Sequence, residues 1–130
     1  MITEDYVSLD VAKLLKEKGF LKDVDLRMTQ NLSFYDNIGL HHNLNKWYDS
    51  LIQDKIDFVV APTHQMTMKW LREIYDIFIV IRRGLTGTGW VYSHEIYKDS
   101  KCWYARYGAS YDTYEEAVEA AIKYCLENLI

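Results

Sequence analysis

Apolar side chains recur at helical spacing near the start of the chain. From residue 7 to residue 15 they fall at positions i, i+4, i+7 and i+8, with lysines on the opposite side. Ser8 is a suitable N-cap for this stripe, and Gly19 stands where a glycine commonly ends a helix. The pattern therefore predicts a helix between Ser8 and Gly19.

Two further helices are predicted in the second half of the chain. Pro62 and Thr63 open a stretch of helical apolar spacing, which predicts a helix over residues 63–75. Thr113 is followed by Glu116 three positions later, as in a capping box, and the apolar stripe that follows predicts a helix over residues 113–129. A weaker stripe predicts another helix over residues 44–53.

Three strand patterns lie between these two C-terminal helices. Ile77–Ile81 is rich in β-branched residues, Trp90–Tyr97 follows as a second strand, and Cys102–Tyr107 returns after a turn at Asp99–Ser100. The glycine-rich segment Gly84–Gly89 separates the first two strands and predicts a hairpin turn. Because the links are short, the three strands are expected to form an antiparallel meander.

Residues 21–60 have the weakest pattern. Val24, Leu26 and Met28 alternate with polar residues, which favours a strand, and a second short strand is expected at Ser33–Tyr35. Phe58–Val60 is expected only as an apolar lead-in to the helix that follows.

Taken together, these elements predict an α+β fold in the order helix, β-region, helix, helix, strand, strand, strand, helix. The three-stranded antiparallel meander is packed by the 63–75 and 113–129 helices, and the N-terminal helix completes the layer. The chain has 130 residues and shows neither an internal repeat nor a linker, so residues 1–130 are expected to form a single domain.

The composition and the N-terminal residues indicate what class of protein this is and where in the cell it is expected. Apolar residues make up 49% of the chain and charged residues 26%, as in a folded globular protein. The N-terminus lacks the basic and apolar regions of an export signal, and no apolar run is long enough to cross a bilayer. We therefore expect a cytoplasmic protein without membrane association, in which Cys102 and Cys125 are reduced.

The residues that usually carry catalysis or bind metals do not form a known motif. The histidines and cysteines lack the short spacings of zinc sites, and no serine elbow or activated-cysteine motif occurs. The glycines of Gly84–Gly89 lead into a strand and no lysine follows them, which favours a turn over a phosphate-binding loop. We expect no metal, no cofactor and no catalytic residue; an enzyme of unknown class is the third alternative for function.

The predicted sheet carries the candidate binding surface. The chain has 11 Tyr and 4 Trp, and its net charge of −4 argues against nucleic-acid binding through bulk charge. Basic residues nevertheless gather among aromatic residues around the strands, as in platforms that stack bases and anchor phosphates. The candidate residues for binding nucleic acid or a protein partner are Arg82, Arg83, Tyr97, Lys98, Lys101, Tyr104 and Arg106.

Two nucleic-acid-binding families share part of this pattern. The order helix, three strands, helix resembles a double-stranded-RNA-binding domain, but that family begins its last helix with a lysine cluster. Here the helix begins with Tyr114, Glu115 and Glu116, and the negative charges of the two glutamates repel phosphates. The segments Trp103–Gly108 and Tyr111–Ala117 are also similar to the final strand and helix of three-stranded DNA-binding domains of the AP2 and integrase-arm type.

A wider resemblance covers both ends of the chain. Tyr6–Phe20, Ala61–Thr63 with Lys69–Glu73, and Tyr114–Ile130 resemble a family of small proteins from phages, prophages and mobile elements of gut Bacteroides-type bacteria. The resemblance is poor over residues 21–58. It implies a small accessory protein made inside the bacterial cell, and it carries no activity or cofactor.

The function that the sequence favours is a non-catalytic protein-interaction module. Such a module binds a protein partner or a second copy of itself. Nucleic-acid binding by the aromatic and basic sheet is the alternative.

Overall fold

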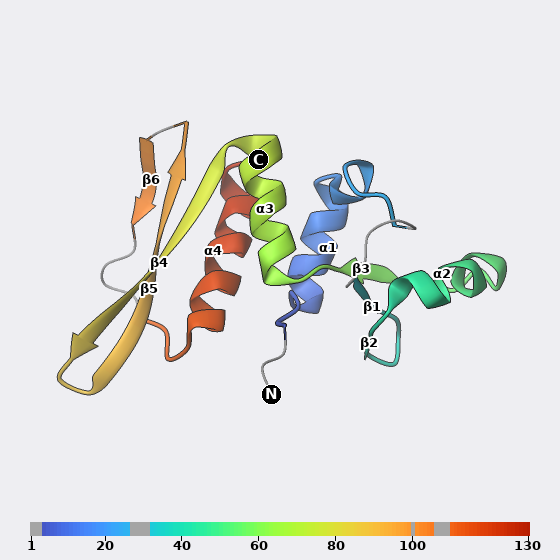
Figure 1. Ribbon diagram of the computed structural model, residues 1–130, viewed down its shortest axis with the longest axis horizontal. Coiled ribbons are helices and arrows are strands. Elements are labelled where there is room, and N and C mark those ends of the chain that lie inside the picture. The colour runs from blue at the N-terminus through green and yellow to red at the C-terminus, as the bar shows by residue number, and fades with distance from the viewer. Residues whose placement is uncertain (1–3, 27–31, 100, 106–109) are drawn as a thin grey trace. The chain divides into compact units, whose positions relative to one another are not determined.

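The computed structural model describes residues 4–26, 32–99 and 110–130, together with the backbone of residues 101–105 (Figure 1). The chain divides into two compact units, residues 1–64 and residues 65–130, and each is described by itself. The described residues contain four α-helices and two three-stranded antiparallel sheets, which confirms the α+β class. The assignment of residues 1–130 to a single domain stays a prediction.

The N-terminal unit opens with helix α1, Leu9–Glu17, as the sequence predicted. The Ser8 hydroxyl accepts a hydrogen bond from the Val11 N–H at 3.3 Å, which satisfies one of the free amides at the helix start. After the helix, Gly19 adopts a left-handed φ of +83°, a conformation that favours glycine. Helix α1 contacts strand β3 (Val59–Ala61) of the same unit.

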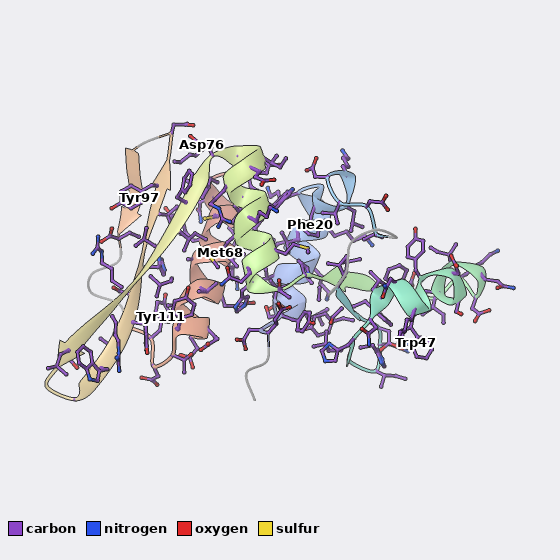
Figure 2. All side chains as sticks on the ribbon, viewed as in Figure 1. Phe20, Trp47, Met68, Asp76, Tyr97 and Tyr111 are labelled. Atoms are coloured by element: carbon purple, nitrogen blue, oxygen red, sulfur yellow. The ribbon has the colours of Figure 1, made fainter. Side chains whose placement is uncertain are left out.

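The segment after α1 differs from the prediction of a strand at Val24–Met28. The structure has a 3-10 helix, η1 (Phe20–Lys22), followed by bends and a turn as far as residue 26. The Lys22 N–H donates to the Gly19 carbonyl at 3.0 Å, and the next amide donates to the Phe20 carbonyl at 3.1 Å. These bonds close η1 around the buried Phe20, which Figure 2 labels, and residues 24–26 follow as a bend and a turn, so the strand prediction is wrong over residues 24–26. Residues 27 and 28 lie outside the described residues.

A small antiparallel sheet completes the N-terminal unit. Strand β1 (Ser33–Tyr35) is central, with β2 (Leu40–His41) on one side and β3 on the other. Helix α2 (Leu44–Gln53) follows β2. Strand β1 and helix α2 agree with the prediction, whereas the lead-in Phe58–Val60 proves to be largely strand. Three residues are too few to show a strand period, so pairing with β1 defines β3.

The C-terminal unit contains the predicted meander. Helix α3 (His64–Tyr75) precedes Asp76, whose left-handed φ of +54° turns the chain into the sheet. Strands β4 (Ile77–Thr86), β5 (Gly89–Lys98) and β6 (Lys101–Ala105) then pair antiparallel in the order β4-β5-β6. The last two residues of the predicted third strand, 106 and 107, lie outside the described residues.

Helix α4 (Tyr114–Asn128) contacts β4 and β5 of this sheet. The Thr113 hydroxyl accepts a hydrogen bond from the Glu116 N–H at 3.1 Å, as the capping pattern predicted. Helix α1 was expected to complete the layer over the meander; it belongs to the N-terminal unit, and its place against the meander stays a prediction. Fully buried apolar residues of β4, β5 and α4 form the core of this unit: Ile77, Ile96, Ala117, Val118, Ala121, Ile122, Cys125 and Leu126.

The turn between β4 and β5 is shorter than predicted. The glycine-rich segment Gly84–Gly89 was expected to form the whole turn, but pairing continues to Thr86 and Gly89, which leaves a two-residue loop. The Thr86 hydroxyl accepts from the Thr88 N–H at 3.3 Å and donates to the Gly89 carbonyl at 3.0 Å. The strands therefore form one long hairpin, and its distal end extends beyond α4 (Figure 1).

Candidate functional site

The register of the hairpin sorts its side chains onto two faces. We call the side covered by α4 the helix face; it carries Ile77, Ile79, Ile81, Arg83, Leu85, Trp90, Tyr92, His94, Ile96 and Lys98. The opposite side is the outer face; it carries Phe78, Val80, Arg82, Gly84, Thr86, Val91, Ser93, Glu95 and Tyr97. Such a division follows from the alternation of side chains along each strand.

The predicted binding residues do not share one face. Arg83 and Lys98 lie on the helix face, whereas Arg82 and Tyr97 lie on the outer face. In β6, Lys101 pairs with Lys98 and Tyr104 pairs with Ile96 in the register, and Arg106 lies outside the described residues.

On the outer face, Glu95 gathers two of the predicted residues. Its side chain is buried, at 4% exposure, and it accepts two hydrogen bonds from the Arg82 guanidinium, the longer one at 3.3 Å. The Tyr97 hydroxyl donates to the same carboxylate at 2.5 Å. The hydrogen bond to Glu95, followed by its negative charge, raises the pKa of Arg82 above its ordinary value. Arg82 is thus already paired with an anion, which reduces its value as a phosphate anchor.

On the helix face, Arg83 stacks on aromatic rings. Its guanidinium carbon lies 4.2 Å from the ring centroid of Trp90 and 5.9 Å from that of Tyr92. Such a cation–π contact at an exposed site contributes about 0.5–1 kcal/mol. Leu85 is the direct cross-strand partner of Trp90, and the two side chains are 69% and 54% exposed. We call Arg83, Leu85, Trp90 and Tyr92 the hairpin surface.

A neighbouring segment of the chain supports the hairpin surface. Tyr111 (Figure 2) forms a bridge with Tyr92, with N–H to carbonyl distances of 2.8 and 2.9 Å. The Tyr111 ring stacks on His94 at 5.8 Å, and Tyr114 meets the Tyr92 ring edge-on at 6.4 Å. These contacts hold Tyr92 beneath Arg83.

Lys98 has a structural contact at the other end of the hairpin. Its ammonium donates to the Leu129 carbonyl at 2.8 Å, close to the C-terminal end of α4. A cation at a helix C-terminus satisfies free carbonyls and the negative end of the helix dipole. Lys98 therefore ties α4 to β5.

Sequence analysis missed most of the hairpin surface. The pattern predicted a strand at Trp90–Tyr97, but it did not bring Arg83 to Trp90 and Tyr92. The reason is the turn: with all of Gly84–Gly89 in the loop, Arg83 and Leu85 have no cross-strand partners. A two-residue turn would have paired them correctly.

The N-terminal unit contains a cleft of about 580 Å³. Lys13 and Lys16 of α1 line it together with two acids, Asp36 and Asp57, and with apolar side chains such as Phe58. The lining thus combines positive, negative and apolar side chains, and it selects neither an anionic nor a cationic ligand.

Asp36 is engaged by its own loop. Its Oδ1 accepts hydrogen bonds from the Ile38 N–H at 2.8 Å and the Gly39 N–H at 3.0 Å, and His41 Nε2 lies 3.0 Å from Oδ2. The hydrogen bond from Gly39 is the largest effect that lowers the pKa of Asp36 below its ordinary value. This is the geometry of an aspartate that closes a turn.

Ser33 and His42 have the spacing of a nucleophile and its base. The Ser33 hydroxyl lies 2.7 Å from His42 Nδ1. Ser33 is completely buried in β1, however, so a substrate carbonyl cannot reach its hydroxyl. In the part of the chain that the structure describes, no three His, Cys, Asp or Glu side chains are grouped to hold a metal ion.

Comparisons of this chain with protein-family models, curated proteins and solved structures find no match. The resemblance to phage and mobile-element proteins therefore stays a prediction. Across residues 4–26, 32–99 and 110–130, no helix has the length and apolar character needed to span a membrane.

Proposed function

We propose that this protein is a protein-interaction module that binds its partner through the hairpin surface. The observation that supports this function is the exposed cross-strand pair of Leu85 and Trp90, at 69% and 54% exposure. Burying a large apolar side chain contributes about 1.5–3 kcal/mol. Tryptophan and arginine are also the residue types that most often dominate protein interfaces, and here Arg83 lies directly on Trp90.

The distribution of charge favours a protein partner over nucleic acid. Of the predicted cations, Arg82 is paired with Glu95, and Lys98 donates to a backbone carbonyl. Among the cations whose side chains the structure describes, Arg83 and Lys98 lie on one face of the hairpin and Arg82 lies on the other, so these three do not form one continuous basic surface. Binding along a phosphate backbone requires several cations on the same side.

We further propose that the protein is a phage or mobile-element accessory protein of the bacterial cytoplasm, in keeping with its resemblance to the family of small phage and mobile-element proteins.

Nucleic-acid binding is the second candidate because Arg83 stacked on Trp90 and Tyr92 also suits a single-stranded base. Fluorescence anisotropy with single- and double-stranded DNA and RNA separates the two functions. Binding that weakens linearly in log–log coordinates with salt, and that is reduced by Arg83→Ala, supports nucleic acid. Absence of binding at low salt removes this candidate.

Photo-crosslinking tests the proposed function. A photoreactive residue in place of Leu85 is expected to form an adduct with a specific protein in bacterial extracts, and Trp90→Ser should abolish it. The same group in place of Arg72, an exposed residue of α3, is the control. With the captured protein purified, Trp90→Ser should weaken binding by about 2 kcal/mol or more, roughly thirtyfold. An affinity unchanged by this substitution contradicts the proposal.

A further inference from the structure

Strand β4 leaves one edge of the sheet unpaired. The strand order is β4-β5-β6, and in the described residues β4 forms its ladder with β5 alone. The five residues from Arg82 to Thr86 are all exposed. An unpaired edge of this kind presents a row of amide and carbonyl groups to which another strand can bind.

The bridge at Tyr111 shows which groups face outward. The Tyr92 N–H and carbonyl bind Tyr111, on the side away from β4. In an antiparallel ladder, Arg83, which lies opposite Tyr92, therefore points its own N–H and carbonyl away from β5. Since this direction alternates along a strand, Ile81 and Leu85 also offer their backbone groups at the free edge.

Two of the features that commonly protect an edge strand, a β-bulge and a proline, are missing from this part of β4. Its ten-residue register with β5 is continuous, so no bulge twists it away, and it contains no proline. On the side of β5 away from β4, Tyr111 already pairs with Tyr92 through two backbone hydrogen bonds. The sheet thus accepts an extended segment beyond its three strands.

Side-chain charge indicates what such a segment carries. Arg83 contacts the rings of Trp90 and Tyr92, and no acid among the described residues lies within ion-pair distance of it. Stacking holds the plane of the guanidinium and leaves N–H groups at its rim to donate to a carboxylate. Arg83 is flanked on its face by apolar Ile81 and Leu85.

We infer that the free edge of β4 binds an extended acidic peptide of the partner protein as an added antiparallel strand. This inference rests on the proposed function and specifies its ligand. Directly opposed side chains on one face form cross-strand pairs. Ile81, Arg83 and Leu85 therefore select an apolar residue, an aspartate or glutamate, and an apolar residue at alternate positions of the peptide.

Fluorescein-labelled peptides with the core Val-Thr-Glu-Thr-Val test the inference by anisotropy with the full chain. Binding is expected, and Arg83→Glu should weaken it by about tenfold or more, as loss of a charge pair followed by like-charge repulsion requires. The peptide with Lys in place of Glu should bind the Arg83→Glu protein better than the original peptide does. Arg72→Glu, a charge reversal on an exposed part of α3, should leave the affinity unchanged.

Backbone methylation of the peptide distinguishes strand addition from side-chain docking. N-methylation of the Glu residue removes an amide that points at β4 and should abolish binding, whereas N-methylation of the adjacent Thr should not. Equal effects at the two positions overturn the inference.

Two further outcomes would also contradict it. If no peptide binds while crosslinks at position 85 persist, strand addition is wrong and the proposed function stands. A concentration-dependent dimer in sedimentation that the peptide cannot displace assigns the edge to a second copy instead.

Discussion

Cys125 lies in the core between α4 and the meander, and the rate of its alkylation measures how often the packing of α4 opens to expose the thiol. The thiol is completely buried. Burial raises its pKa from 9.0 to about 12. Only the thiolate reacts with alkylating reagents, so a rise of about three pKa units lowers the reactive fraction near neutral pH by about a thousandfold. Lack of access to the sulfur lowers the rate further.

The assay uses a Cys102→Ser background, so that Cys125 is the single thiol. Its reaction with iodoacetamide at pH 8 is followed by mass spectrometry in buffer and in denaturant. We expect the native rate to be at least about a thousandfold below the denatured rate. Ile96→Ala, which opens a cavity opposite the helix and destabilises the folded protein by about 2–5 kcal/mol, should increase the native alkylation rate.

The same shift predicts the pH dependence of stability. Because the folded pKa is raised, the neutral thiol is favoured in the folded state, and its contribution is fully present below the unfolded pKa near 9.0. It is lost as pH rises from about 9 towards 12, by up to about 1.4 kcal/mol for each pH unit. Cys125→Ala should therefore flatten the fall in unfolding free energy over this range. Rapid alkylation of the native protein, at the rate of an exposed cysteine, would refute the burial of α4.

Three other predictions concern the caps, the turns and the binding surface. Thr113→Ala removes the acceptor of the Glu116 amide and should lower the unfolding free energy by about 1 kcal/mol in urea titrations, whereas Thr113→Ser should largely retain it. Asp36 has a lowered pKa, so its contribution to the unfolding free energy is present above the ordinary pKa of 3.8 and is lost as pH falls below that value. Asp36→Asn should therefore reduce the loss of stability in acid, and an unchanged acid profile of the unfolding free energy would contradict this prediction. Trp90→Ser removes an exposed side chain and should change the unfolding free energy by no more than about 1 kcal/mol while weakening partner binding; a large loss of stability would mean that Trp90 belongs to the core.

The parts of the fold that were predictable are those with local signals. Ser8 and Thr113 cap their helices through hydrogen bonds three residues away, so the caps are visible in the sequence itself. Strand β3 has no such signal, because its three residues become a strand only by pairing with β1, which is distant in sequence. Residues 24–26 alternate like a strand, yet they form a bend and a turn directly after the local hydrogen bonds of η1.

The hairpin surface depends on the register between β4 and β5, and the glycines of the turn region made this register hard to predict. Three glycines between residues 84 and 89 suggested a wide loop, but Gly84 pairs with Val91 inside the ladder. That pairing brings Arg83 over Trp90 and Tyr92, and it also moves Arg82 to the other face, next to Glu95. The candidate cations were thus identified by type, while their separation onto two faces required the structure.

The number of available cations argues for a particular kind of ligand. A phosphate backbone carries a charge at every nucleotide, and its affinity grows with each cation that contacts it. On the hairpin surface one guanidinium, that of Arg83, has no acid within ion-pair distance among the described residues, whereas Arg82 is matched by Glu95 and Lys98 by a carbonyl. A single cation set between apolar Ile81 and Leu85 matches a single carboxylate set between apolar side chains. Backbone hydrogen bonds along β4 would then supply affinity, and Arg83 would supply the selection of one acidic position in the bound strand.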